Sequence, residues 1–180
     1  MSVCVCSVSA CLLLALLFGG ACCAAAACRN RCCAFVENFP PRLKDLRTSF
    51  HKMKDYYEDK DQIETALLDS SVLLEIQSPY GCRAMNDILH FYLDTVLPAA
   101  KNASDDFKPH IANIGTIFYE LKRELLYCKD YFSCKKPFEL ESIIDAYNKM
   151  QEQGLYKAMG ELDLLFNYIE EYMVSKRRPH

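Results

Sequence analysis

Cysteine usage constrains the fold of this chain more than any other feature of its sequence. Six cysteines lie in the body of the chain, and five others lie in an apolar leader or at its edge. An even number of cysteines in an oxidising compartment predicts disulfides, although six cysteines allow 15 pairings and spacing alone does not choose among them. A zinc site is the alternative, but the paired C-x2-C spacing of zinc ribbons and fingers is missing. The six are Cys28, Cys32, Cys33, Cys82, Cys128 and Cys134.

The leader predicts secretion. Residues 9–27 carry no charge, and an apolar centre at residues 12–18 is followed by small residues. This pattern is typical of a signal peptide over residues 1–22, with cleavage between residues 20 and 27, and of a domain over residues 23–180. The alternative is a membrane anchor, but the strongly apolar run is short and no basic cluster follows it at once. We therefore expect a secreted, extracellular protein whose mature form is not inserted in a membrane.

The body of the chain predicts an all-α fold. Apolar residues recur every three or four positions, and no useful alternating strand pattern occurs. Pro98 is expected to end the helix before it, and Gly154 is expected to cap the penultimate helix at its C-terminus. This reading gives five or six helices, with apolar faces over residues 43–57, 82–97, 111–125, 140–150 and 155–172 and a short helix within 58–80.

Two segments predict further properties. The last two helices form an apolar pair that joins the remainder through residues 134–137, a hinge that would allow the pair to pack on a partner chain. Asn102 begins an N-x-S sequon in the polar connection after Pro98, where a loop would suit glycosylation; an unused sequon is the alternative.

Catalytic and nucleic-acid-binding signatures are absent from the sequence. It contains none of the nucleophile-elbow, zinc-protease, phosphate-loop or calcium-loop motifs, and none of its four histidines lies beside another histidine or a cysteine at a metal-ligand spacing. The net charge of -3 does not suit a nucleic-acid binder. We therefore expect no enzyme activity, no metal and no cofactor.

Charge separates onto two predicted helices. The first helix is mostly basic on its exposed face, and the last carries several carboxylates. Two solvated faces are the commoner explanation of such a pattern, whereas a binding surface of mixed sign is the more specific one. Amphipathic helices alone would equally suit a secreted carrier of an apolar ligand.

Several ordered runs are similar to those of a known family. They are PRLKDLR at residues 41–47, YGC at 80–82, FYLD at 91–94, LP at 97–98 and QGLYKAMGELD at 153–163, continued by NYIE at 167–170. On these runs the body of the chain, from Cys28 to its C-terminus, resembles the interleukin-10 family.

The resemblance implies a particular fold and particular disulfides. Family members form a six-helix cytokine bundle, and two chains exchange their last two helices to give an intertwined homodimer. The resemblance pairs Cys32 with Cys128 and Cys82 with Cys134. Cys28 and Cys33 resemble an additional pair of fish members, so we expect them to bond to each other.

The resemblance also implies a function, that of a secreted anti-inflammatory cytokine. Family members bind a high-affinity receptor chain through the first helix, the loop after it and the last helix, and then recruit a shared second chain. Glu58 stands where mammalian members have an amide. The second chain would contact the first and fourth helices around Arg42 and Asn113. The positions that match the first surface are Lys44, Arg47, Lys54, Glu58, Glu161, Asp163 and Glu170.

Overall fold

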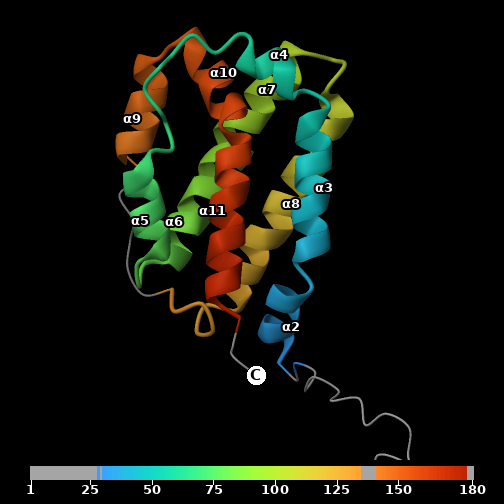
Figure 1. Ribbon diagram of the computed structural model, residues 1–180, viewed down its shortest axis with the longest axis vertical. Coiled ribbons are helices and arrows are strands. Elements are labelled where there is room, and N and C mark those ends of the chain that lie inside the picture. Colours follow the sequence, from blue (N-terminus) through green and yellow to red (C-terminus); the bar gives the residue numbers. More distant parts are fainter. Residues whose placement is uncertain (1–27, 29, 135–140, 178–180) are drawn as a thin grey trace, which may run out of the picture.

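The computed structural model describes residues 28, 30–134 and 141–177, which form helices and the turns between them, with no strand among them (Figure 1). The all-α prediction is thereby confirmed. No helix within these residues is long and apolar enough to cross a bilayer. The helices are α2 (Arg31–Glu37), α3 (Pro40–His51), α4 (Lys54–Glu58), α5 (Ser70–Gln77), α6 (Gly81–Phe91), the π-helix η1 (Tyr92–Val96), α7 (Leu97–Ala103), α8 (Lys108–Tyr127), α9 (Glu141–Lys149), α10 (Glu152–Gly160) and α11 (Leu162–Ser175).

Helix α11 runs through the middle of the bundle, with α3 on one side and α5 on the other (Figure 1). Helix α8 packs against both α3 and α6, and α10 packs against α4. The Phe166 ring of α11 lies 6.0 Å from Phe50 of α3 and 6.2 Å from Phe118 of α8, measured between centroids. All three side chains are essentially inaccessible to solvent. The apolar face of α11 therefore holds α3 and α8 together.

Three disulfides bridge the described cysteines. Cys32 bonds to Cys128, Cys82 to Cys134 and Cys28 to Cys33, with Cα–Cα distances of 5.7, 5.0 and 5.6 Å. These are the pairs that the family resemblance implies. All six cysteines precede residue 135, so the bonds brace the part of the bundle from α2 to α8, and no disulfide ties α9, α10 or α11 to it.

Pro98 does not end its helix, contrary to the sequence prediction. The chain remains helical through η1 and α7 as far as Ala103, and Pro98 lies in the first turn of α7. The Leu97 N–H donates to the Tyr92 carbonyl, five residues back. Pro98 has no N–H to donate, and its ring would crowd the carbonyl of the preceding turn in a regular α-helix. We attribute the continuity of the helix to the wider π turn just before Pro98, which accommodates the ring. Asn102 consequently lies in the exposed last turn of α7 and not in a loop; its glycosylation stays a prediction.

Gly154 does not cap a helix, which is a second correction. Helix α9 ends at Lys149, and Gly154 lies buried within α10. A Cβ added at Gly154 would lie 2.6 Å from the Tyr147 carbonyl oxygen and 3.1 Å from its ring. The absence of a side chain therefore permits the close approach of α9 and α10, and this is what the position requires of glycine.

The turn between α9 and α10 holds Gln151 at φ 51° and ψ -128°, a region that glycine adopts far more easily. The Gln153 N–H donates to the Met150 carbonyl at 3.1 Å, which closes a turn of type II′ geometry. We expect Gln151→Gly to raise the free energy of unfolding by about 1 kcal/mol, measured by chemical denaturation. Asp145→Gly, on the exposed face of α9, is the control and should be destabilising. Equal losses from both substitutions would contradict the strained turn.

The last helices pack within their own chain in this structure. Helix α11 contacts α3 and α5, and α10 contacts α4. The predicted last helix is divided at Glu161, which separates α10 from α11, and α2 is a further helix that the apolar periodicity did not predict. Most of the predicted hinge, at residues 135–137, and the predicted signal peptide, at residues 1–22, lie outside the described residues. A single chain does not test the intertwined homodimer, which stays a prediction.

Candidate functional site

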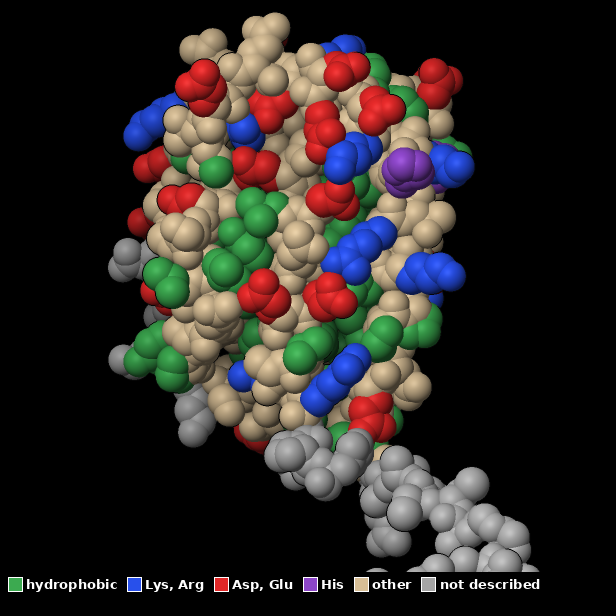
Figure 2. All heavy atoms as spheres, viewed as in Figure 1, with side chains coloured by type: hydrophobic (Ala, Val, Ile, Leu, Met, Phe, Trp, Pro, Cys, Tyr) green, Lys and Arg blue, Asp and Glu red, His purple; other side chains and the backbone are tan. Residues whose placement is uncertain are grey.

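A surface groove of about 720 Å³ lies between α3 and α11, and we call it the α3/α11 groove. Its floor is apolar, because Leu43 and Phe50 turn their buried side chains toward it, and its rims are charged. Figure 2 shows basic side chains over α3 beside acidic side chains over α11. The lining residues are Pro40, Leu43, Lys44, Arg47, Thr48, Phe50, His51, Lys52, Lys54, Asp163, Asn167 and Glu170.

Helical register explains why these polar side chains share one surface. Lys44, Arg47 and His51 are three and four residues apart on α3, so they lie along one stripe of the helix. Leu43, Leu46 and Phe50 form the buried stripe beside them. On α11 the same spacing aligns Asp163, Asn167 and Glu170.

Two ion pairs cross the groove. Arg47 Nη2 lies 2.7 Å from Glu170 Oε2 and also donates to Asn167 Oδ1 at 2.9 Å. Lys54 Nζ lies 2.8 Å from Asp163 Oδ2 and 3.5 Å from Glu58 Oε1. The hydrogen bond to Asp163 raises the pKa of the Lys54 ammonium, with burial opposing it.

These pairs are open to solvent. The side chains of Arg47, Glu170, Lys54 and Asp163 are 40, 48, 34 and 42 % exposed. Exposed ion pairs contribute only about 0–1 kcal/mol each to stability, so exchanging them for pairs with a binding partner costs the fold little.

The structure brings most of the predicted receptor-binding residues together. Lys44, Arg47 and Lys54 line one rim of the groove, and Asp163 and Glu170 line the other. Glu58 borders the groove through its ion pair with Lys54. The sequence prediction did not include Asn167, His51 or Thr48 among the site residues. Their helical register with the predicted ones is the signal that identifies them.

Glu161 lies elsewhere and faces inward. Its carboxylate accepts hydrogen bonds from the backbone N–H of Leu67 at 3.0 Å and of Leu68 at 2.7 Å. Its side chain is 12 % exposed and lies 3.7 Å from Lys157 Nζ. Burial raises the pKa of the Glu161 carboxyl, and the two amides and Lys157 oppose that shift. The structure therefore does not bring Glu161 to the α3/α11 groove.

The surface implied for a second receptor chain joins α3 and α8. Arg42 pairs with Glu120 at 3.0 Å, and its side chain is 49 % exposed. The Asn113 side-chain amide donates to the Ser49 hydroxyl at 2.8 Å. These contacts place Arg42 and Asn113 on neighbouring stripes of the two helices.

One group of side chains in the described part of the chain has the proximity of metal ligands, namely Cys28, Cys33 and Glu37. The two cysteines are bonded to each other, so their sulfurs are not free thiolates. The α3/α11 groove contains neither a nucleophile activated by a base nor a paired acid and base. Its arrangement suits the binding of a protein surface with charges of both signs.

A disulfide-braced helical bundle with a charged groove between its first long helix and its last is the architecture of a helical cytokine. The family model described as Interleukin 10 matches residues 7–175. The chain belongs to the interleukin-10 family.

Individual relatives are similar over most of the chain. Interleukin-10 of Gallus gallus is 38% identical over 149 residues, which are 82% of this chain and 85% of the relative. Interleukin-10 of Sus scrofa is 37% identical over 150 residues, 83% of this chain and 86% of the relative. A solved structure of human cytomegalovirus IL-10, bound to a soluble human receptor, has a TM-score of 0.48 and 25% identity and covers 77% of this chain and 94% of that one.

Proposed function

We propose that this protein is a secreted anti-inflammatory cytokine that binds a high-affinity receptor chain through the α3/α11 groove. The observation that carries the proposal is the pair of exposed ion pairs, Arg47–Glu170 and Lys54–Asp163, across a groove with an apolar floor. Membership of the interleukin-10 family supports a cytokine over the alternative of a carrier of an apolar ligand. A binding role of this kind requires no catalysis.

Electrostatics would guide the encounter. The basic rim on α3 and α4 and the acidic rim on α11 present opposite charges a few ångströms apart, so a receptor with a complementary pattern is attracted in one orientation. On docking, charged receptor side chains replace some of the ion pairs within the groove by ion pairs with the receptor. The floor formed by Leu43 and Phe50 offers apolar contact. Recruitment of a shared second chain through the surface of Arg42 and Asn113 would then bring two receptor chains together.

The remaining parts of the proposal follow from the sequence. We infer secretion through removal of the leader at residues 1–22, and an intertwined homodimer formed by exchange of the helices that follow residues 134–137. No disulfide ties α9 to α11 to the preceding helices, which supports such an exchange. Light scattering of the purified mature protein measures its mass in solution; a stable monomer would contradict the homodimer.

Substitutions on each rim test the binding surface. We expect Arg47→Ala and Asp163→Ala each to weaken binding to the immobilised ectodomain of the high-affinity receptor by roughly tenfold to a hundredfold, because each removes a charged contact and leaves a partner charge unpaired. Lys101→Ala, on the exposed side of α7, is the matched control and should leave binding unchanged. Binding at wild-type strength by both groove variants would contradict the assignment.

A further inference from the structure

We propose that Asp61, Lys157 and Glu161, which we call the loop anchor, hold the loop of residues 59–69 in place and so position the receptor-binding groove without contacting the receptor. This inference rests on the proposed function, since it concerns how that groove is shaped. It assigns Glu161 a positioning role instead of the receptor contact that the sequence predicts.

The loop has few hydrogen bonds of its own after its first turn. Two amides near its end, those of Leu67 and Leu68, donate to Glu161, and the Gln62 N–H donates to Gln153 Oε1 at 3.3 Å. The Tyr168 hydroxyl donates to the Leu68 carbonyl at 3.0 Å. These partners belong to α10, to α11 or to the junction between them, so docking of these helices determines where the loop lies.

The anchor places one ammonium between two carboxylates, and all three groups are mostly out of solvent. Lys157 Nζ lies 2.8 Å from Asp61 Oδ2 and 3.7 Å from Glu161 Oε1. The side chains of Lys157, Asp61 and Glu161 are 8, 16 and 12 % exposed. Contacts between partly buried charges are weakened little by salt and are costly to break one partner at a time. The anchor therefore has the burial expected of an internal support, whereas the ion pairs of the groove are open.

The anchor adjoins both rims of the groove. On one side, the Asp61 N–H donates to the carbonyls of Tyr57 and Glu58, which continues α4 into the loop. A Cβ added at Gly160 would lie 3.8 Å from Asp61 Oδ2 and 3.9 Å from Glu58 Cγ, so the end of α10 lies close to both. Glu58 in turn pairs with Lys54.

On the other side, Glu161 ends α10 and is followed directly by α11, on which Asp163 begins the acidic rim. Movement of the loop would thus shift Glu58 and Lys54 relative to Asp163. The anchor fixes the separation of the two rims at the end of the groove nearest α4.

Two substitutions of Glu161 separate positioning from direct contact. Glu161→Leu and Glu161→Gln remove the same charge, but only glutamine retains an oxygen that accepts from the amides of Leu67 and Leu68. In the free protein, we expect Glu161→Leu to accelerate hydrogen exchange of these two amides roughly tenfold or more, because they lose their acceptor. In Glu161→Gln their exchange should stay close to that of the wild type.

Receptor binding should follow the same order. We expect Glu161→Leu to weaken binding roughly tenfold, and Glu161→Gln to bind nearly as tightly as the wild type. Equal losses in both variants would show that the receptor reads the charge itself, and would overturn the inference. Slow exchange of the two amides in Glu161→Leu would overturn it as well.

Amide hydrogen exchange in α8 distinguishes a general loss of stability from a local effect on the loop. Amides around Leu121, which is buried and distant in sequence, should exchange at the wild-type rate in Glu161→Leu. Equal acceleration there would mean that Glu161 supports the whole bundle and not the loop, against the inference. If the wild type itself fails to bind the receptor, the proposed function fails, while the exchange measurements still decide whether the anchor holds the loop.

Discussion

Replacing both Cys32 and Cys128 by alanine is expected to lower the free energy of unfolding by about 4–5 kcal/mol and the melting temperature by roughly 10–20 °C. The bond joins residues 96 positions apart. Its loss frees a long stretch of the unfolded chain, which raises the conformational entropy of the unfolded state. Chemical denaturation of the mature protein measures the change.

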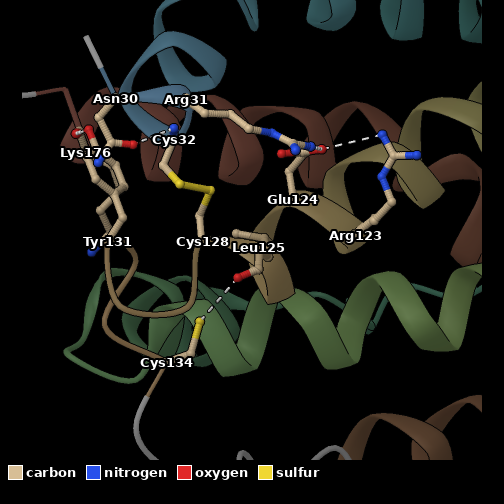
Figure 3. Close-up of a disulfide and its surroundings, with 10 residues drawn as sticks. All are labelled: Asn30, Arg31, Cys32, Arg123, Glu124, Leu125, Cys128, Tyr131, Cys134 and Lys176. Atoms are coloured by element: carbon tan, nitrogen blue, oxygen red, sulfur yellow. Dashed lines mark hydrogen bonds and ion pairs between the residues drawn. A yellow bond between two sulfur atoms is a disulfide. The ribbon is translucent and has the colours of Figure 1, made fainter. Parts of the chain in front are cut away.

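Alanine is the appropriate replacement because both cysteines are buried. Cys32 is 8% exposed and Cys128 is 3% exposed, so a serine hydroxyl would be buried at either position. Figure 3 shows the bond between α2 and the end of α8, with Arg31 and Glu124 paired beside it at 2.6 Å. That ion pair would remain in the variant, so the measured loss reports on the covalent link.

The other two disulfides supply matched controls. The same loop-length argument gives about 4 kcal/mol for Cys82–Cys134 and about 2 kcal/mol for Cys28–Cys33, whose sequence separations are 52 and 5. We therefore expect the loss of unfolding free energy to be largest in the double alanine variant of Cys32–Cys128, smaller in that of Cys82–Cys134 and smallest in that of Cys28–Cys33. The account would be contradicted if removal of the Cys28–Cys33 pair destabilised the protein most.

Truncation of Phe166 to alanine should cost about 3–5 kcal/mol of unfolding free energy. The side chain is fully buried, and its ring packs edge-on against Phe50 and Phe118. The substitution opens a cavity where α3, α8 and α11 meet, and this cavity cannot close without moving a helix. Since α11 also carries Asp163 and Glu170, receptor binding should weaken with it.

Tyr119→Ala is the control for Phe166→Ala. Tyr119 is an aromatic residue of α8 that is 61% exposed, so its truncation should change the unfolding free energy by no more than about 0.5 kcal/mol. Thermal and chemical denaturation should agree on the order of the two variants. A loss at Phe166 as small as that at Tyr119 would contradict the central position of α11 in the core.

Helical periodicity predicted much of the fold and of the groove. Leu43, Leu46 and Phe50 form the buried stripe of α3 as their spacing indicates, and the charged residues beside them line the groove. Local patterns succeed here because a residue's side of a helix follows from its position in the sequence.

Features that depend on the exact path of the backbone, or on contacts distant in sequence, were not predicted. The π turn of η1 keeps the chain helical through Pro98. Gly154 is required by the close approach of the Tyr147 carbonyl and not by a helix end. Glu161 lies in an acidic stretch, yet its carboxylate accepts hydrogen bonds from the amides of Leu67 and Leu68, which lie 94 and 93 positions away in the sequence. No local pattern reports that partnership, because it depends on how α10 docks against the loop.

Chemical labelling of lysines, with and without the high-affinity receptor ectodomain, tests the central claim most directly. Lys44 is exposed on the rim of the α3/α11 groove, and Lys101 is exposed on α7, outside the groove lining. If the receptor binds the groove, modification of Lys44 by an amine-reactive reagent should fall several-fold in the complex, while Lys101 reacts as in the free protein. Unchanged labelling of Lys44 in a complex that demonstrably forms, or protection of Lys101 alone, would contradict the proposed binding surface.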